Sequence, residues 1–278
     1  MLRAAWIRLR PPKPRCSRDA QRMVRGHGLE IGGPTSLFRS WLPLYDVVGS
    51  LDNVNFRRNT IWEGTIVEGQ TFRYHPARPA GTQYLLDATS LDAISSDRYD
   101  FLLASHILEH LANPIKALHE FSRVVVPGGA IVVIIPHKDG TFDHRRPVTA
   151  VAHMIADADN DVGEDDQTHL AEILACHDLE RDPGAGSFEA FRARCLDNEA
   201  QRAVHHHTFT TQTAMELLQA AGLEVRIVEP VLGIHIILLA TVPRTVAPSV
   251  TRPFVYPSPF PSDRPQLRTE RMNPRVAW

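Results

Sequence analysis

The sequence predicts an α/β protein with a doubly wound, mostly parallel sheet of seven strands, in which the final strand runs antiparallel. Between residues 24 and 242, short apolar runs rich in β-branched residues alternate with stretches of helical periodicity. Runs that are apolar throughout are typical of strands buried on both faces by flanking helices. The last two runs are too close for an intervening helix, so we expect them to pair antiparallel.

The elements follow one another in a regular order. The first strand, GLEIGG from residue 28, runs into two glycines, and the second candidate, YDVVGSLD, begins at residue 45. QYLLDATS at 83 and YDFLLAS at 99 are the third and fourth strands, and a helix follows from about Asn113 to Val125. PGGAIVVIIPH supplies the fifth strand, and a helix over residues 210–222 ends at Gly222. The final pair is LEVRIVEP and GIHIILLATV.

Three segments depart from this alternation. Residues 1–23 are arginine-rich, and we interpret them as a solvated basic leader, although an organelle transit peptide has a similar composition. Residues 243–278 contain eight prolines and are predicted to form an extended or disordered tail. Residues 138–207 follow the fifth strand, at the edge where open α/β sheets bind ligands. We expect one domain over residues 24–242, in which residues 138–207 cap a substrate pocket. The alternative is a peripheral cap without a chemical role.

The composition is that of a soluble globular protein of 278 residues, 43% hydrophobic and 22% charged, with a formal net charge of −2. This balance gives no electrostatic reason to expect nucleic acid as a partner. Cys16, Cys176 and Cys195 are far apart and form no CxxC pair, which favours a reducing, cytoplasmic compartment. No apolar run reaches the roughly 18 residues of a membrane helix, so no membrane contact is expected.

The first strand ends in Glu30-Ile31-Gly32-Gly33, where glycines let the backbone approach a ligand closely. The third glycine of a dinucleotide-binding loop is missing. Pro34 stands where a helix would begin around a pyrophosphate, so a ligand without phosphates is favoured.

Two acidic positions follow later strands. Asp52, beside Asn53, is predicted to end the second strand, where a carboxylate can bind both hydroxyls of a ribose. A turn aspartate is the structural alternative. Asp87-Ala88 ends the third strand, where a carboxylate can accept the amine proton of an adenine edge or cap the next helix.

The segment SHILEHL contains His106-x-x-Glu109-His110, which is the spacing of the inverted zinc-peptidase motif. The same stretch directly follows an apolar strand, and Asn113-Pro114 soon interrupts any helix. The spacing alone is therefore compatible with a zinc-dependent hydrolase and with an ordinary helix start at the end of a buried strand.

In combination these motifs resemble those of class I S-adenosylmethionine-dependent methyltransferases, of the small-molecule, methyltransferase type 11-like kind. LEIGG, Asp52, DATSL, YDFLLASHILEHLANP and RVVVPGGAIVVIIPH occur in the family's order over about residues 24–241, although the glycine loop is shortened. The resemblance implies a Rossmann-like methyltransferase fold, S-adenosylmethionine as cofactor, a small-molecule or sugar-containing acceptor, and no metal. A zinc hydrolase and a methyltransferase-like protein without catalysis remain alternatives. The cofactor-binding residues it implies are Glu30, Gly32, Gly33, Asp52, Asn53, Asp87, Ala88, Ser105 and His106.

The cap segment is expected to receive the methyl acceptor. It contains TFDHRRP, GEDDQTHL and AVHHHTF, and a histidine suits the removal of a hydroxyl proton because its pKa lies near neutrality. Arginines there can pair with an acidic acceptor. A metal site around Asp165, Asp166, His169 or the three consecutive histidines is conceivable, but a solvated surface is favoured. The predicted catalytic residues are His137, His144 and His207, with His206 as a further candidate, and the predicted acceptor-binding residues are Arg145, Arg146, His169 and His205.

Overall fold

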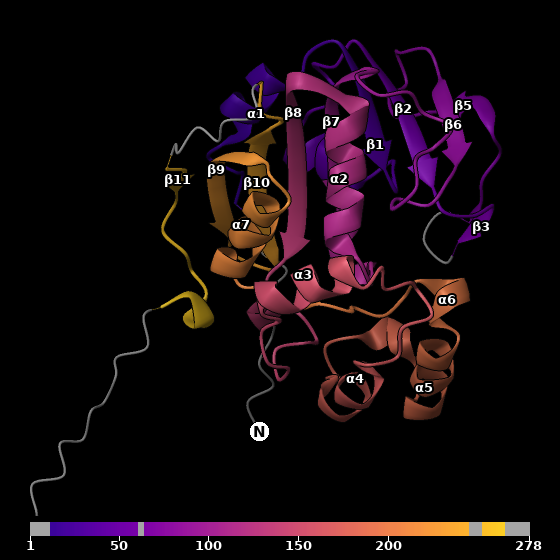
Figure 1. Ribbon diagram of the computed structural model, residues 1–278, viewed down its shortest axis with the longest axis vertical. Coiled ribbons are helices and arrows are strands. Elements are labelled where there is room, and N and C mark those ends of the chain that lie inside the picture. The colour runs from indigo at the N-terminus through magenta and orange to yellow at the C-terminus, as the bar shows by residue number, and fades with distance from the viewer. Residues whose placement is uncertain (1–11, 61–63, 245–251, 265–278) are drawn as a thin grey trace, which may run out of the picture.

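The computed structural model describes residues 12–60, 64–244 and 252–264. Its centre is a nine-stranded sheet in the order β11-β9-β10-β8-β7-β1-β2-β6-β5, with helices on both faces (Figure 1). The five middle strands run parallel, as their continuous apolar sequences predict. These are β6 (Gly81–Leu85), β2 (Ser50–Asn55), β1 (His27–Ile31), β7 (Tyr99–Ser105) and β8 (Val125–Pro136).

The last two long strands pair antiparallel with each other, and the final one reverses the direction of the sheet. β10 (His235–Thr241) lies between β8 and β9 (Glu224–Val231) and pairs antiparallel with both. This pairing confirms the predicted seven-stranded core with its reversed final strand. Two shorter strands, β5 (Gly69–Phe72) and β11 (Phe254–Val255), extend the two edges of this sheet. β3 (Asn59–Thr60) and β4 (Gly64–Thr65) pair with each other in a separate sheet.

Helices cover both faces of the sheet, so the core consists of two layers of side chains. In β7, Leu102 is buried on the face that carries α2, α3 and α7, whereas Leu103 is buried on the face that carries α1 and the π-helical turn η1. Successive residues point to opposite faces, which explains why the strand is apolar throughout. The elements are α2 (Pro114–Val124), α3 (Val151–Asp159), α7 (Thr211–Ala220), α1 (Ser17–Met23) and η1 (Leu37–Trp41).

The two helices predicted from the sequence begin at residues that cap them. The Asn113 side chain accepts a hydrogen bond from the first turn of α2, and Thr210 forms a capping box with Thr213 at the start of α7. After α7 the chain turns at Gly222, which has a φ of +82°. Gly222 therefore closes this helix as predicted.

The second strand differs from its prediction. β2 spans Ser50–Asn55, whereas residues 45–49 form a turn in which Tyr45 is buried. The register places Asp52 opposite Leu29, in the middle of the sheet. The expectation that Asp52 ends this strand is therefore wrong. The apolar run that begins at Tyr45 packs against one face of the sheet and does not belong to it.

Parts of both terminal segments pack against the domain. The backbone N–H groups of Arg15 and Cys16 donate to the Glu229 carboxylate at 2.9 and 2.7 Å. Near the other end, the ring of Phe260 stacks on His137 with 3.9 Å between centroids. Residues 12–23 and 252–264 therefore do not form the expected solvated leader and loose tail. The rest of both predictions, over residues 1–11, 245–251 and 265–278, lies outside the described residues.

Residues 138–207 lie at the end of the sheet to which the arrow of β8 points (Figure 1). α3 packs beside α2, and the helices after it form a lobe with a small core of its own around Ile173, Phe191 and Cys195. Within the described ranges, no helix is long and apolar enough to span a membrane. The remaining helices are η2 (Leu108–His110), η3 (Lys138–Gly140), α4 (Leu170–Cys176), η4 (Pro183–Ala185), α5 (Phe188–Leu196), α6 (Asn198–Gln201) and η5 (Pro261–Asp263).

Candidate active site

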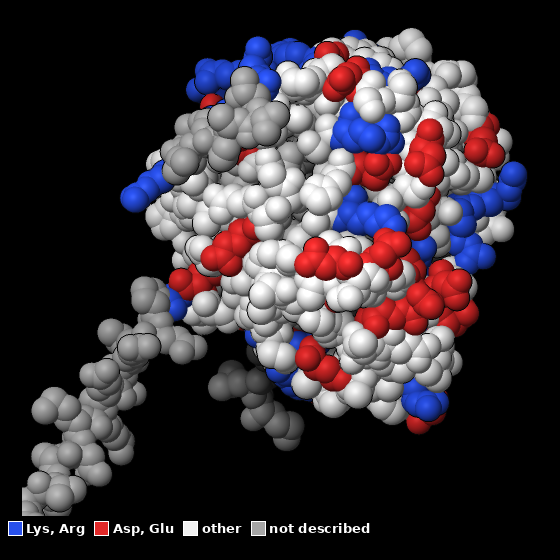
Figure 2. Space-filling view, viewed as in Figure 1, with Lys and Arg blue, Asp and Glu red and all other residues white. Residues whose placement is uncertain are grey.

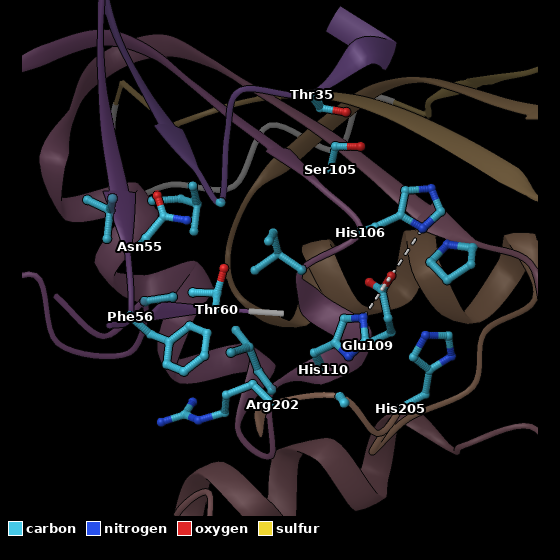
Figure 3. A pocket seen from close by; sticks show the side chains of 18 of the residues that line it. Thr35, Asn55, Phe56, Thr60, Ser105, His106, Glu109, His110, Arg202 and His205 are labelled. Carbon is cyan, nitrogen blue, oxygen red and sulfur yellow. Dashed lines mark ion pairs between the residues drawn. The ribbon is translucent and has the colours of Figure 1, made fainter. Parts of the chain in front are cut away.

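A cavity of about 1040 Å³ opens at the carboxyl ends of β1, β2 and β7, between the sheet and the cap (Figure 3). Its volume is at the upper end of the roughly 300–1,000 Å³ that ligand pockets usually have. Gly32, Asn55 and Ser105 line it from the strand ends, and Phe142 and His205 line it from the cap. Open α/β sheets bind ligands in this position.

The glycine turn after β1 brings bare backbone to the cavity wall. Gly32 has a φ of +77°, a conformation in which a side chain is strained, and a Cβ atom there would also lie 2.4 Å from Cδ1 of Ile107, which would have to move. Asn53 holds the turn from the next strand, because it accepts from the Gly33 amide at 3.0 Å and donates to the Gly33 carbonyl at 3.1 Å. Of these three predicted residues Gly32 lines the cavity, whereas Gly33 and Asn53 shape the turn from behind.

Glu30 supports the same turn from the protein interior. Both of its carboxylate oxygens accept from the Tyr45 hydroxyl at 2.8 Å, and the residue is 1% exposed. Burial and the adjacent Glu30 raise the pKa of Tyr45, so the phenol stays a neutral donor. The carboxylate fills the space next to Gly33 that a Cβ atom would need. This predicted cofactor residue therefore positions the turn and does not line the cavity.

Asp52 also lies away from the cavity. Its carboxylate binds Nε2 of His27 at 3.2 Å and accepts from the Tyr99 hydroxyl at 3.0 Å. Burial opposes ionisation, but its hydrogen bonds outweigh burial and lower the pKa of Asp52. Asn55 and Phe56 occupy the carboxyl end of β2, where Asp52 was expected, and both line the cavity.

Asp87 connects the sheet to the cap. It does not line the cavity, whereas its predicted neighbour Ala88 does. Nη2 of Arg202, from the cap, donates to Asp87 at 2.8 Å, and Nη1 lies 3.1 Å from Glu164. Burial opposes ionisation of Asp87, but hydrogen bonds from Thr89 and the charge of Arg202 lower its pKa. Arg202 itself lines the cavity, so this ion pair fixes part of the cavity wall.

Ser105 and His106 line the cavity directly after β7. The Ser105 hydroxyl is buried and finds no hydrogen-bond partner in the described parts of the chain. His106 has a φ of +56°, which is uncommon for a residue other than glycine and is often found at functional sites. Its Nδ1 lies 3.2 Å from Oε1 of Glu109 (Figure 3). Its Nε2 lies 3.0 Å from Nδ1 of His235.

Glu109 is a fully buried carboxylate in the cavity wall. Its Oε1 also lies 4.0 Å from Nε2 of His110. Burial opposes ionisation, but the hydrogen bond and charge of His106 outweigh it and lower the pKa of Glu109. Burial lowers the pKa of His110 to about 4, so this ring is neutral near pH 7, and its Nδ1 binds the Val204 carbonyl at 3.0 Å.

An aspartate–histidine pair from the cap belongs to the same site. Nδ1 of His205 lies 2.5 Å from Oδ2 of Asp143, whose other oxygen accepts from the buried guanidinium of Arg146 at 3.1 Å. Burial raises the pKa of Asp143, but His205 and Arg146 outweigh this and lower it to about 2. Asp143 in turn raises the pKa of His205, against the effect of burial. Because Nδ1 is occupied, Nε2 is the nitrogen that His205 can offer to a ligand.

None of the three predicted catalytic histidines lines the cavity. His137 is buried under the C-terminal segment, stacked on Phe260. His144 binds Asp178 at 2.9 Å on the outer side of the cap. His207 is buried, with Nε2 3.1 Å from a backbone carbonyl. Each of these rings is thus held by groups outside the cavity.

The predicted acceptor-binding residues do not lie together at the cavity either. Arg145 binds Asp178 at 3.0 Å, and His169 lies 2.9 Å from another histidine outside the cavity. Arg146 is fully buried and acts through Asp143 and the backbone of the cap. Of the four, His205 lines the cavity.

Several residues at the site were not predicted from the sequence. Asn55 and Phe56 were missed because the second strand was placed too early along the chain. His205 was predicted, but its partner Asp143, 62 positions away, was not, and neither was Arg202, which is 115 positions from its partner Asp87. No local spacing could have paired these residues.

The parallel sheet with its reversed final pair and the glycine turn at the cavity define a class I methyltransferase. The chain belongs to the family described as "Methyltransferase domain", which it matches over residues 19–228, more than half of its length. It is an S-adenosylmethionine-dependent methyltransferase, and S-adenosylmethionine is its cofactor.

Family membership decides against the zinc hydrolase and the non-catalytic binding protein. The zinc-peptidase spacing also lacks its structural context, because His106 precedes a helix of only three residues and has a left-handed backbone. The two histidines of a peptidase motif need one face of a longer helix.

Comparison with solved structures finds S-adenosylmethionine-dependent methyltransferases from several organisms. The protein from Mesorhizobium loti is 15% identical, with a TM-score of 0.47, over 81% of this chain and 95% of the other. The Thermotoga maritima protein is 18% identical, with a TM-score of 0.41, over 82% and 89%. The Methanosarcina mazei protein is 14% identical, with a TM-score of 0.42, over 79% and 93%. A comparison with curated protein sequences finds no match.

Proposed function

We propose that this enzyme methylates an oxygen atom of a small-molecule or sugar-containing acceptor in the cytoplasm, with His205 as general base. The observation that carries the proposal is the Asp143–His205 pair at the cap side of the cavity. An acceptor hydroxyl loses its proton when its oxygen is methylated. Nε2 of His205 can take this proton, and Asp143 stabilises the imidazolium that forms.

The strand ends have the features needed to hold the cofactor. S-adenosylmethionine supplies an electrophilic methyl group on a sulfonium, which is transferred by in-line displacement. Gly32 leaves the backbone open to the methionine end, and the same wall contains the Ser105 hydroxyl, which has no hydrogen-bond partner among the described residues. Asn55, at the end of β2, can bind the ribose hydroxyls in place of the expected aspartate. Ala88 offers a small side chain beside which the adenine can lie.

The enclosure of the cavity supports a small acceptor. Phe142, Arg194 and Arg202 line it from the cap, so an acceptor must enter between the cap and the sheet. On the face shown in Figure 2, basic and acidic side chains are interspersed. Such a mixed surface attracts a polyanion less than a continuous basic patch does. We therefore favour a small molecule over nucleic acid.

Release of S-adenosylhomocysteine with a panel of hydroxylated and amino-substituted small molecules and sugars tests the proposal. We expect turnover with hydroxylated acceptors, and we expect His205→Gln to lose it while its affinity for S-adenosylmethionine stays unchanged. His144→Gln is the matched control, because this histidine also binds an aspartate but lies outside the cavity. Turnover confined to amines, undiminished in His205→Gln, would contradict the proposal.

A further inference from the structure

A second histidine cluster lies outside the cavity, where α3 meets the start of α4 and the end of the cap. One ring nitrogen from each of His153, His169 and His207 lies within 4.8 Å of the other two. Nε2 of His153 is 2.9 Å from Nε2 of His169. Asp157, one turn further along α3, places Oδ2 3.5 Å from Nε2 of His153. None of these four residues lines the cavity, and the methylation proposed above does not use them.

We propose that His153, Asp157, His169 and His207 bind one divalent transition-metal ion of the zinc type, which holds α3, the start of α4 and the end of the cap together. Three imidazoles and one carboxylate form a ligand set that zinc accepts. Ligand atoms about 2.1 Å from a tetrahedral zinc ion lie roughly 3.4 Å from one another. The separations of 2.9 Å between His153 and His169 and of 3.5 Å between His153 and Asp157 lie on either side of this value, so each of these two pairs needs little movement to share an ion.

Two buried atoms of the cluster have no hydrogen-bond donor among the described residues. Oδ2 of Asp157 receives no hydrogen bond from the described residues. Nε2 of His207 lies 3.1 Å from the Ala112 carbonyl, which favours the tautomer with its N–H there. Nδ1 of His207 then carries a buried lone pair that receives no hydrogen bond from the described parts of the chain. Oδ2 of Asp157 lies 3.9 Å from the ring of the same histidine, at Nε2, so a cation in this cluster would give the carboxylate oxygen its missing partner. Ligating histidines commonly donate their other N–H to a backbone carbonyl, as His207 can do to Ala112.

The position of the cluster suggests what the ion does. The side chain of His153 is 42% exposed, which gives an ion a path from solvent. The ligands come from α3, from the start of α4 and from the segment that leads to α7. His207 is two residues after His205, so the ion would hold the part of the cap that carries the proposed base. Four protein ligands complete a tetrahedral site and indicate a structural role.

Cobalt and zinc binding to the full chain test this proposal without any assay of turnover. We expect one zinc ion per chain by elemental analysis, and a visible tetrahedral Co²⁺ spectrum that zinc abolishes. Asp157→Asn and His169→Gln should each weaken zinc binding at least about 100-fold, since even outer-shell substitutions cost about 10–100-fold. His119→Gln, an exposed histidine on α2, is the matched control and should bind like the wild type.

Two outcomes would overturn the proposal. One is the absence of bound ion in the folded wild-type protein after incubation with excess zinc. The other concerns Glu109, His110 and His205, which also place ligand atoms within 4.8 Å of one another. If Glu109→Gln abolishes the Co²⁺ spectrum and His169→Gln leaves it intact, the ion belongs to the cavity. Far-UV circular dichroism establishes folding, and zinc should raise the Tm of the wild type and His119→Gln but not of Asp157→Asn.

Discussion

Oδ2 of Asp143 lies 2.5 Å from Nδ1 of His205, although 62 positions separate the two residues in the chain. Arg146 holds the other aspartate oxygen and the His205 carbonyl, so the imidazole keeps one orientation. An aspartate orients the catalytic histidine of serine hydrolases in the same way. Here the pair would supply a methyltransferase with a base on the acceptor side of its cavity.

Asp143→Asn should lower kcat by roughly 10²–10⁴-fold. The amide has nearly the same shape but cannot stabilise an imidazolium on His205. The dissociation constant of S-adenosylmethionine should not change, because Asp143 does not line the cavity. Steady-state release of S-adenosylhomocysteine, together with calorimetric titration of the cofactor, measures both quantities. Asp178→Asn removes a similar histidine-bound carboxylate outside the cavity and should keep its activity; equal losses in the two variants would refute this role.

Gly32→Val should abolish measurable binding of S-adenosylmethionine. A side chain at a φ of +77° is strained, and its Cβ atom would approach Ile107 to 2.4 Å at the cavity wall. Gly69→Ala is a suitable control, because Gly69 also has a positive φ but has no atom within 4 Å of a Cβ and lies on an edge strand. Calorimetry on both folded variants provides the measurement. Unchanged affinity in Gly32→Val would remove the glycine turn from the cofactor site.

Asp52 and Asn55 should respond differently to substitution. Asp52→Asn disturbs buried hydrogen bonds and should reduce the free energy of unfolding by about 1–3 kcal/mol, with little change in cofactor affinity. Asn55→Ala should weaken cofactor binding, because this side chain lines the cavity, and should also lower stability, because its Oδ1 accepts hydrogen bonds from Asn53 and Gln83. Urea unfolding and cofactor titration of each variant distinguish these effects. The reverse pattern would show that Asp52 is a cofactor ligand after all.

The protein should lose stability as the pH falls below about 6.5. Burial lowers the pKa of His110 to about 4 and that of His235 to about 3. The unfolded chain therefore takes up protons first, and each histidine reduces the free energy of unfolding by about 1.4 kcal/mol per pH unit between its two pKa values. Above pH 6.5 both rings are neutral in either state, and the effect vanishes.

Urea unfolding at pH 7, 6 and 5 measures this dependence, and His235→Gln should give a shallower slope than the wild type. His119→Gln is exposed and should keep the wild-type slope. Identical slopes for His235→Gln and the wild type would show that His235 does not make the predicted contribution.

The core of the fold could be predicted because its signals are local. The apolar run of β8 and the short connection before β10 indicate a parallel sheet with a reversed end, whatever packs around it. The start of the second strand was predicted wrongly, because an apolar run that is buried in a loop cannot be told from one that pairs in a sheet by its sequence. Tyr45 is buried under the sheet, where its hydroxyl binds Glu30, and the pairing begins only at Ser50.

The site was predictable where a residue directly follows a strand, as for Gly32, Ser105 and His106. The part of the site that the cap contributes was not predictable, because the cap segment and the residue before it contain eight histidines. Which ring reaches the cavity depends on contacts between distant segments, such as those of Asp143 with His205. Composition indicated a titratable cap, but tertiary packing decides that, of the cap histidines, it is His205 that lines the cavity.

Calorimetric titration of S-adenosylmethionine and S-adenosylhomocysteine into the full chain shows whether the cavity binds the cofactor. Both compounds should bind with micromolar affinity and with one site per chain. Binding should survive His205→Gln but not Gly32→Val. A folded wild-type protein that binds neither compound would contradict the assignment of the cavity as the cofactor site.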